Sequence, residues 1–333
     1  MIPVTLKLYL DQRKMQQAIA WSEVNKSWIV TDTDLVASIL KSGNFLSDNP
    51  TAYLQRIAEE SNIEIPRILG ALRDAPSVLN GDDHKRARRQ FAAQLAPRIA
   101  AVAERFSEEC TQGLQQVLRS GDTVDLFSQM LLPAINAALS PLGGREISAE
   151  LFTIVSPSQV ISSAQMFSGA RLRRLEAEVS AGPVAGEPAT CDHVMPLFAR
   201  DPTLGSLGLS LIETVKANPG QRLCDMHWPL QFIRSSLPFV VRVAAVDTEI
   251  AGKHIRKGDT VTIYVGAFRE DNSLYFGSGP HRCLGEALAK LLWERFIASI
   301  SVRTERLEIE QVDYRAGDVV FVMPVKIQVK VTS

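Results

Sequence analysis

Cys283 is the residue whose surroundings most clearly indicate chemistry. It lies in the segment 276–285, whose sequence is FGSGPHRCLG, with glycines on both sides and a proline that stiffens the loop. Glycine allows backbone conformations that other residues avoid, so several amide N–H groups can point at one atom. A helix is predicted to begin at Leu284, and the free amides and dipole of a helix N-terminus favour a thiolate. The segment therefore predicts an electron-rich sulfur that can bind a metal ion.

The metal centre that suits this sulfur best is haem iron. A cysteine thiolate is the axial ligand that promotes O–O cleavage at such an iron. His281 lies two residues before the cysteine and could donate a hydrogen bond to an anionic edge of the haem. A buried cysteine in a glycine-rich turn is the ordinary structural interpretation, but it leaves the dense pattern of glycine, histidine and cysteine unexplained.

The other three cysteines, Cys110, Cys191 and Cys224, have no comparable surroundings, and no two cysteines form a CxxC pair. Neither a disulfide scaffold nor a zinc site built from several cysteines is expected in a chain of this kind. If one cysteine carries chemistry, it is Cys283.

A second candidate group is the basic stretch 84–89. His84 and Arg88 are four residues apart, so on a helix they share one face and could hold one carboxylate. A short basic stretch is more often a solvated face. Arg86 and Arg89 fit that description, or could help to dock an acidic electron donor.

Charge and hydropathy limit the classes of partner. Lysine and arginine together number 36, and aspartate and glutamate 37, so the overall charge favours neither a nucleic acid nor an anionic membrane surface as partner. No run approaches the roughly 18 uninterrupted apolar residues that span a bilayer. We therefore expect a soluble, cytoplasmic protein that does not bind a membrane.

The periodicity of apolar residues predicts a mainly α protein with a small β part. The predicted helices cover residues 35–41, 84–118 with an interruption near Pro97, 126–139, 149–178, 192–217 and 284–300. The predicted strands are residues 27–32, a small antiparallel sheet in 241–265 that turns at Gly252 and Gly258, and much of the last thirty residues. Pro196 and Pro202 should kink or break the helix 192–217. Residues 180–190 form a loop rich in glycine and proline.

With these elements in place, the segment 276–285 resembles the haem-binding signature of the cytochromes P450. Further landmarks follow in that family's chain order, at residues 28–47, 81–91, 241–252 and 284–300. The resemblance implies a shortened, divergent bacterial-type member with the mainly α cytochrome P450 fold, as a single haem domain over residues 1–333. It further implies a haem b cofactor.

The resemblance also assigns roles to individual residues. Cys283 is the iron ligand, in a loop that contacts the haem through Phe276, Gly277 and Gly285. The haem propionates are held by four residues: His84, Arg88, Arg242 and His281.

Two departures from the family pattern concern its structural core. The Glu-x-x-Arg motif of the family reads Gln231-Phe-Ile-Arg234 here, so the acid is missing. Residues 269–275 run almost directly into Phe276, which leaves no room for the usual meander. Glutamine can still accept a hydrogen bond from Arg234. Phe239 and Val240, after this QxxR helix, would line the substrate pocket together with Arg200 and Pro202.

A third departure concerns oxygen chemistry. In the family, the central helix carries an acid followed by a threonine, which deliver protons to bound dioxygen. In the equivalent stretch here, Asp201 takes the position of the acid and Pro202 that of the threonine, and proline has no hydroxyl. An alignment shifted by one residue would instead let Thr203 serve. Arg200 could pair with a substrate carboxylate, and the sequence of arginine and proline resembles peroxide-using members.

Two functions follow as expectations. The first is a haem-thiolate oxidoreductase, a monooxygenase or a peroxide-using enzyme, that oxidises a small organic substrate. Its electrons would come from a ferredoxin- or flavodoxin-type partner, or peroxide would serve directly. The alternative is a divergent relative with non-redox chemistry such as dehydration or isomerisation, or a haem- or ligand-binding partner protein. The short region 149–192, which covers the pocket in the family, predicts an open pocket or a small lid.

Overall fold

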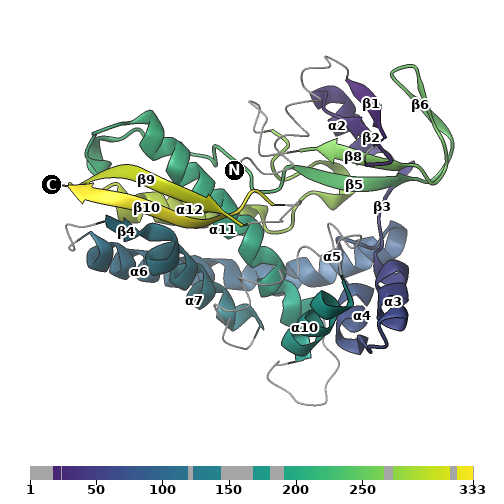
Figure 1. The fold of residues 1–333 in the computed structure, drawn as a ribbon, viewed down its shortest axis with the longest axis horizontal. Helices are drawn as coiled ribbons and strands as arrows, with labels where there is room; N and C mark the ends of the chain where they lie inside the picture. Colours follow the sequence, from purple (N-terminus) through teal and green to yellow (C-terminus); the bar gives the residue numbers. More distant parts are fainter. Residues whose placement is uncertain are drawn as a thin grey trace.

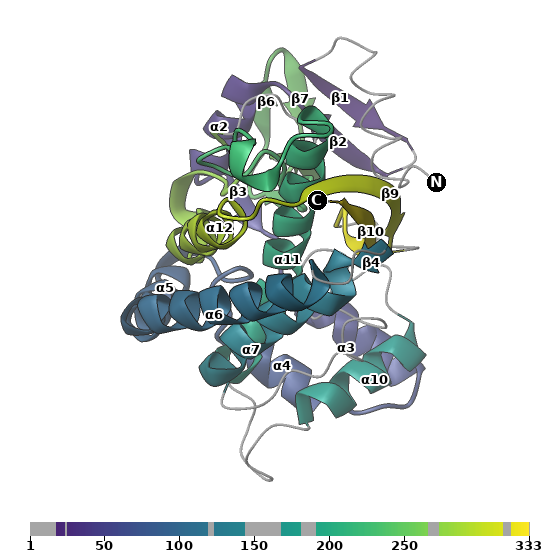
Figure 2. The same ribbon diagram turned by 90° about the vertical axis from the view of Figure 1, so that its left-hand side faces the viewer.

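The computed structural model describes residues 18–23, 25–118, 123–143, 168–180, 191–265, 273–315 and 321–332. Figure 1 shows two sheets on opposite sides of the upper half of the molecule and a layer of helices below them. One long helix links the two halves, and Figure 2 shows it running through the middle of the molecule. The expectation of a mainly α protein with a small β part is confirmed.

Most of the helices that the sequence predicts are present at nearly the predicted positions. The helices are α2 (Thr33–Lys41), α3 (Thr51–Glu60), α4 (Pro66–Arg73), α5 (Gly81–Leu95), α6 (Ile99–Val117), α7 (Leu132–Gly143), α10 (Gly169–Ser180), α11 (Cys191–Ala217) and α12 (Glu286–Ile300). Two of them, α3 and α4, were not predicted. A 3-10 turn at Ala96–Arg98 separates α5 from α6, at the expected interruption near Pro97. A π-helical turn at Phe127–Leu131 precedes α7. The predicted helix 149–178 and the loop 180–190 lie largely outside the described residues.

The strands form three sheets. They are β1 (Ile19–Ser22), β2 (Ser27–Val30), β3 (Phe45–Ser47), β4 (Thr123–Asp125), β5 (Phe239–Ala244), β6 (Thr248–Ile250), β7 (Lys253–Ile255), β8 (Thr260–Tyr264), β9 (Arg306–Tyr314) and β10 (Pro324–Thr332). The larger sheet has the order β1-β2-β8-β5-β3, in which β2 and β8 are parallel and the other neighbours antiparallel. The second sheet has the order β4-β10-β9, and β6 and β7 form a hairpin. The predicted antiparallel sheet of 241–265 is therefore part of a mixed sheet.

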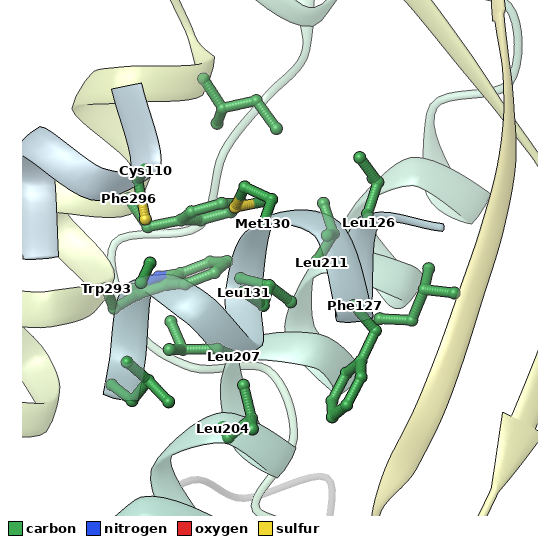
Figure 3. Close-up of a cluster of buried hydrophobic side chains, with 14 of the residues drawn as sticks. Cys110, Leu126, Phe127, Met130, Leu131, Leu204, Leu207, Leu211, Trp293 and Phe296 are labelled. Carbon is green, nitrogen blue, oxygen red and sulfur yellow. The ribbon is translucent and has the colours of Figure 1, made fainter. Parts of the chain in front are cut away.

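The principal hydrophobic core lies between α6, α7, α11, α12 and the sheet that contains β10. Figure 3 shows its centre, where Trp293 stacks on Phe296 with ring centroids 5.7 Å apart. The side chains of Cys110, Met130 and Leu207 lie around these rings. Burial of such large apolar side chains is the main source of folding free energy, so this core fixes α11 and α12, which lead to the candidate site.

A second, separate core joins α3, α4 and α10. Its members include Leu54, Ile68 and Leu172, which are all buried. The carboxylate of Glu176 in α10 accepts hydrogen bonds from the backbone amides of Arg67 (2.8 Å) and Ile68 (2.9 Å) at the start of α4. A carboxylate satisfies the free amides of a helix N-terminus and interacts favourably with its dipole, so Glu176 attaches α10 to α4.

The central region differs from expectation at two points. Pro196 and Pro202 were expected to kink or break α11, and the break does not occur: the helix continues through both, and its apolar side chains pack against the principal core from Leu204 onward. The segment 229–238, which contains Gln231 and Arg234, is not a helix but irregular chain. No helix among the described residues is long and apolar enough to cross a membrane.

Candidate functional site

The loop that carries Cys283 directly precedes α12 in the chain and packs against the end of α2. Gly277 and Gly279 have positive φ angles of 71° and 69°, which side chains other than glycine rarely adopt. A Cβ atom on Gly279 would overlap the carbonyl oxygen of Leu40 in α2, so only glycine allows this contact. The amide of Cys283 donates to the carbonyl oxygen of Phe276 at 2.8 Å, which closes the loop.

The surroundings of the Cys283 thiol act on its pKa in opposite directions. Backbone amides of Gly285 and Glu286 donate to the sulfur, and the guanidinium of Arg88 lies near it; all three lower its pKa, as the sequence predicts for the start of a helix. Burial outweighs them, so the pKa of the thiol is raised overall. Cys283 is nevertheless exposed in part, and a cation bound there would favour the thiolate.

Four basic side chains from three parts of the chain meet beside this loop. His84 and Arg88 come from α5, Arg242 from β5, and His281 from the loop itself. The rings of His84 and His281 are 4.0 Å apart between centroids. Arg242 is 7% exposed and donates to the carbonyl oxygen of Val241 at 2.8 Å. The structure thus brings together the four residues that the resemblance assigned to the haem propionates.

The pKa of every member of this basic cluster is lower than its ordinary value. Burial, followed by the charges of Arg242, His84 and Arg88, lowers the pKa of His281 to about 3. Burial lowers the pKa of Arg242 to about 10, and it also lowers the pKa values of His84 and Arg88. None of the four forms an ion pair with an acid in the part of the chain that the structure describes.

The basic cluster fits an anionic group. The Nε2 atom of His84 is buried and has no hydrogen-bond partner among the described residues, although a buried polar atom normally has one. Adjacent cations without an acid repel one another, and a bound carboxylate would relieve that repulsion. The two propionates of a haem are carboxylates of this kind, and Cys283 lies next to Arg88. The residues present therefore fit a haem.

The remaining arginines of the basic stretch are on the solvent side. Arg86 pairs with Asp83 at 2.6 Å, and both side chains are exposed. Arg89 is also exposed. These two residues form a solvated face of α5, whereas His84 and Arg88 point toward the Cys283 loop.

The candidate residues on α11 form a buried ion-pair network. Asp201 and Arg200 have no exposed surface. One carboxylate oxygen of Asp201 lies 3.2 Å from Nε of Arg200, and the other lies 3.0 Å from Nη1 of Arg315, which follows β9. Burial lowers the pKa of Arg200, and Asp201 opposes that shift. The proton-delivery role of Asp201 stays a prediction, as does the pairing of Arg200 with a substrate carboxylate.

Pro202 and Thr203 follow on the same helix, and both are partly buried. The carbonyl oxygen of Pro202 accepts a hydrogen bond of 2.8 Å from the hydroxyl of Ser236. Phe239 packs on Tyr264, with ring centroids 5.8 Å apart, and Val240 packs against the core of the larger sheet. The roles of Thr203 in proton delivery and of the other three in a substrate pocket remain predictions.

Arg234 has a different partner from the one expected. Gln231 is exposed and does not pair with Arg234, whose guanidinium instead lies 3.9 Å from the carboxylate of Glu213 in α11. The expected bond required Gln231 and Arg234 to lie on one helix, and the segment is irregular. The sequence does single out Glu213, since it is the one charged residue in the stretch 204–215.

Comparisons with known proteins agree with this geometry. No protein-family model matches the chain. The chain is 23% identical to vitamin D3 dihydroxylase from Streptomyces griseolus, over 88% of this chain and 85% of the relative. It is 24% identical to the cytochrome P-450 monooxygenase DoxA from Streptomyces sp. (strain C5), over 80% and 78% of the two chains.

Solved structures extend the comparison to nearly the whole chain. The crystal structure of CalO2 matches with a TM-score of 0.74 and 16% identity, over 99% of this chain and 97% of the other. P450BioI, crystallised with an acyl carrier protein that carries hexadec-9Z-enoic acid, matches with a TM-score of 0.73 and 20% identity, over 98% and 97%.

The fold is therefore the haem-thiolate fold of the cytochromes P450. The chain is similar in sequence to bacterial cytochromes P450 and shares their fold, which supports a haem-thiolate oxidoreductase at the level of that family.

Proposed function

We propose that this protein binds one haem b through Cys283 and oxidises a small organic substrate with oxygen or peroxide. The observation that carries the proposal is the acid-free basic cluster beside the Cys283 loop, whose donors suit two carboxylates. Arg242 and Arg88 would hold the propionates, with His84 and His281 as further donors. When bound, the haem would supply the cleavage of the O–O bond.

Each protein group has a defined task in this proposal. The amides of Gly285 and Glu286 donate to the sulfur and stabilise its anionic form. Gly277 and Gly279 hold the loop in the shape that aims those amides. Arg242 would hold its carboxylate more strongly than the partly exposed Arg88, because a buried cation binds a carboxylate more strongly than an exposed one does.

Activation of dioxygen requires proton donors, and few are found in the expected part of α11. Pro202 offers neither a hydroxyl nor an amide proton, and both oxygens of Asp201 are held by arginines. We therefore propose that peroxide, which already contains the reduced O–O unit, supports turnover better than dioxygen with electrons from a ferredoxin- or flavodoxin-type donor. Thr203 is the remaining hydroxyl on this part of α11.

The test of haem ligation is an absorption spectrum of the purified protein, oxidised and then reduced under carbon monoxide. The parent should show the thiolate signature, and Cys283→Ser should lose it. Serine at Cys110, Cys191 or Cys224 should leave it unchanged. A protein that carries no haem after expression in haem-replete cells, and takes none up, would refute the proposal.

The test of the oxidant compares the rates with peroxide and with dioxygen plus donor on one substrate. Pro202→Thr should shift the ratio toward dioxygen, because it restores a hydroxyl on α11. Efficient dioxygen turnover in the parent, unchanged by the substitution, would contradict this part of the proposal.

A second function is favoured by the loss of the Glu-x-x-Arg acid and by the engagement of Asp201. The protein would then bind haem but catalyse a non-redox reaction, such as a dehydration or an isomerisation, or act as a binding partner. A haem-loaded protein with the thiolate signature that neither peroxide nor reduced donor can turn over would support this alternative.

A further inference from the structure

The irregular segment 229–238 lies between α11 and β5 and is largely buried. Phe232, Ser235, Ser236 and Pro238 are all buried although no helix or strand pairs their backbone. Buried amides and carbonyls need partners, and side chains from other elements provide them. Two carbonyl oxygens of this segment accept from the indole of Trp293 (2.9 Å) and from the hydroxyl of Tyr275.

Two serines of α11 hold the amides of the same segment. The hydroxyl oxygen of Ser210 accepts from the amides of Ile233 (3.1 Å) and Arg234 (3.4 Å). The hydroxyl oxygen of Ser206 accepts from the amide of Ser236 at 3.1 Å. Ser206 and Ser210 are four residues apart, so they lie on one face of α11.

The contact between this face and the segment is close. A Cβ atom on Gly205 would lie 2.6 Å from Cβ of Ser236 and 3.1 Å from Sδ of Met323, so only glycine fits. The hydroxyl of Ser236 donates to the carbonyl oxygen of Pro202 at 2.8 Å, and its carbonyl oxygen accepts from the amide of Val322 at 2.8 Å. Ser236 is therefore fixed from two sides.

The ion pair of Arg234 cannot replace these bonds. Its atoms are 3.9 Å apart, and the side chains of Arg234 and Glu213 are 35% and 44% exposed. An exposed pair at that distance is screened by solvent and contributes little. Ser210 and Ser236 have no exposed surface, and a buried hydrogen bond is costly to lose because its partner then stays unsatisfied.

We propose that Ser206 and Ser210 are positioning residues that set β5 relative to α11, in place of the Glu-x-x-Arg network that this chain lacks. The inference rests on the proposed haem-binding function. β5 begins three residues after Ser236 and carries Arg242 of the basic cluster. α11 carries Asp201, Pro202 and Thr203. The serines would therefore fix the distance between the basic cluster and the part of α11 that carries these three residues.

The test uses Ser206→Ala and Ser210→Ala, with Thr214→Val as matched control. Thr214 is a buried hydroxyl one turn further along α11, and it donates to the carbonyl oxygen of Ser210 in its own helix. The control thus removes a hydroxyl from the same helix without touching the segment. Both serine variants keep the fold's apolar contacts, and Ser206 is only partly buried whereas Ser210 has no exposed surface, so at least Ser206→Ala should remain folded.

Two measurements are made on the haem-loaded protein. In Ser206→Ala, hydrogen exchange should accelerate at the amide of Ser236; in Ser210→Ala, it should accelerate at the amides of Ile233 and Arg234. The expected acceleration is about fivefold or more, which corresponds to the net free energy of one hydrogen bond. Transfer of haem to a scavenging apoprotein should accelerate in both variants. Thr214→Val should change neither measurement.

The outcomes separate the inference from the function on which it rests. A parent without haem refutes the proposed function. A parent that holds haem, with variants whose exchange accelerates but whose haem transfer is unchanged, shows that the serines only stabilise the segment and overturns the inference. Unchanged exchange at the three amides overturns it as well.

Discussion

His84 and Arg242 are buried, Arg88 and His281 are partly buried beside them, and no acid stands among the four, so a positive charge on them is unfavourable until an anion binds. Substitution of a residue outside this group should not change how tightly the anion is bound. Arg88 and Arg89 are adjacent in α5 but differ in this respect, since Arg88 donates to the carbonyl oxygen of Arg282 in the Cys283 loop and Arg89 faces solvent.

Arg88→Ala should therefore accelerate haem release roughly tenfold or more, because a charge-assisted hydrogen bond contributes about 1.5–3 kcal/mol. Arg89→Ala is the control and should leave the release rate unchanged. The measurement is the rate of haem transfer to a scavenging apoprotein. Equal effects of the two variants would mean that the basic stretch acts only as a charged surface.

His84 gives the haem-free protein a pH dependence. Its pKa is lowered from the ordinary value of 6.5 by burial and by the charges of Arg88 and Arg242. The unfolded state then binds a proton that the folded state rejects, so stability is highest above pH 6.5 and falls as the pH drops below it. His281 contributes in the same direction.

His84→Gln should reduce the loss of melting temperature between about pH 7.5 and about pH 5, a range above the ordinary titration of carboxylates. His227→Gln, at an exposed histidine, should not. A slope that is the same in the parent and in His84→Gln would show that His84 takes up no proton on unfolding.

At the scale of elements, the Cys283 loop depends on two glycines for different reasons. Gly277 has a positive φ but open space around its Cα, whereas Gly279 has a positive φ and also contacts the end of α2. Gly277→Ala should lower the free energy of unfolding by about 1 kcal/mol through backbone strain. Gly279→Ala should lower the free energy of unfolding by about 3 kcal/mol or more, because the added Cβ would also force the end of α2 to move. Denaturant unfolding of both variants checks this, and equal losses would contradict it.

Local patterns predicted the elements that depend on neighbouring residues alone. The glycines around Cys283, the spacing of His84 and Arg88, and the interruption at Pro97 are all visible in short stretches of sequence. Only the resemblance to the cytochromes P450 brought Arg242 into the basic cluster.

The features that the sequence did not predict are set by contacts between residues that lie far apart in the chain. Asp201 is held by Arg315, 114 positions away, and no local pattern links the two. The segment around Gln231 was predicted to be helical, but Ser206 and Ser210 offer its amides acceptors from another helix, which removes the need for helical hydrogen bonds. The rise in the pKa of Cys283 follows from burial, which only the assembled fold determines.

At the scale of the whole molecule, α3, α4 and α10 share a core of their own, which is separate from the principal core. Such a unit can open without global unfolding. Glu176 is the charged link within it, since its carboxylate accepts from two amides of α4.

Glu176→Gln should increase hydrogen exchange in α4 and α10, because it removes the charge from these two bonds. Exchange in α12, which belongs to the principal core, should stay the same. Glu59→Gln, at an exposed residue of α3, is the control. A uniform increase through all helices would show that the two cores unfold as one cooperative unit.

The irregular segment 229–238 also has a consequence for the order in which the chain assembles. Its partners lie on α11, on α12 and at Val322, 86 positions after Ser236. Its internal hydrogen bonds are local ones between Ser235 and Leu237, so the segment gains little from becoming ordered before its distant partners are in place. It should therefore become ordered after the transition state for folding. Substitutions such as Ser210→Ala should then speed unfolding while leaving the folding rate nearly unchanged, which stopped-flow kinetics in denaturant can measure.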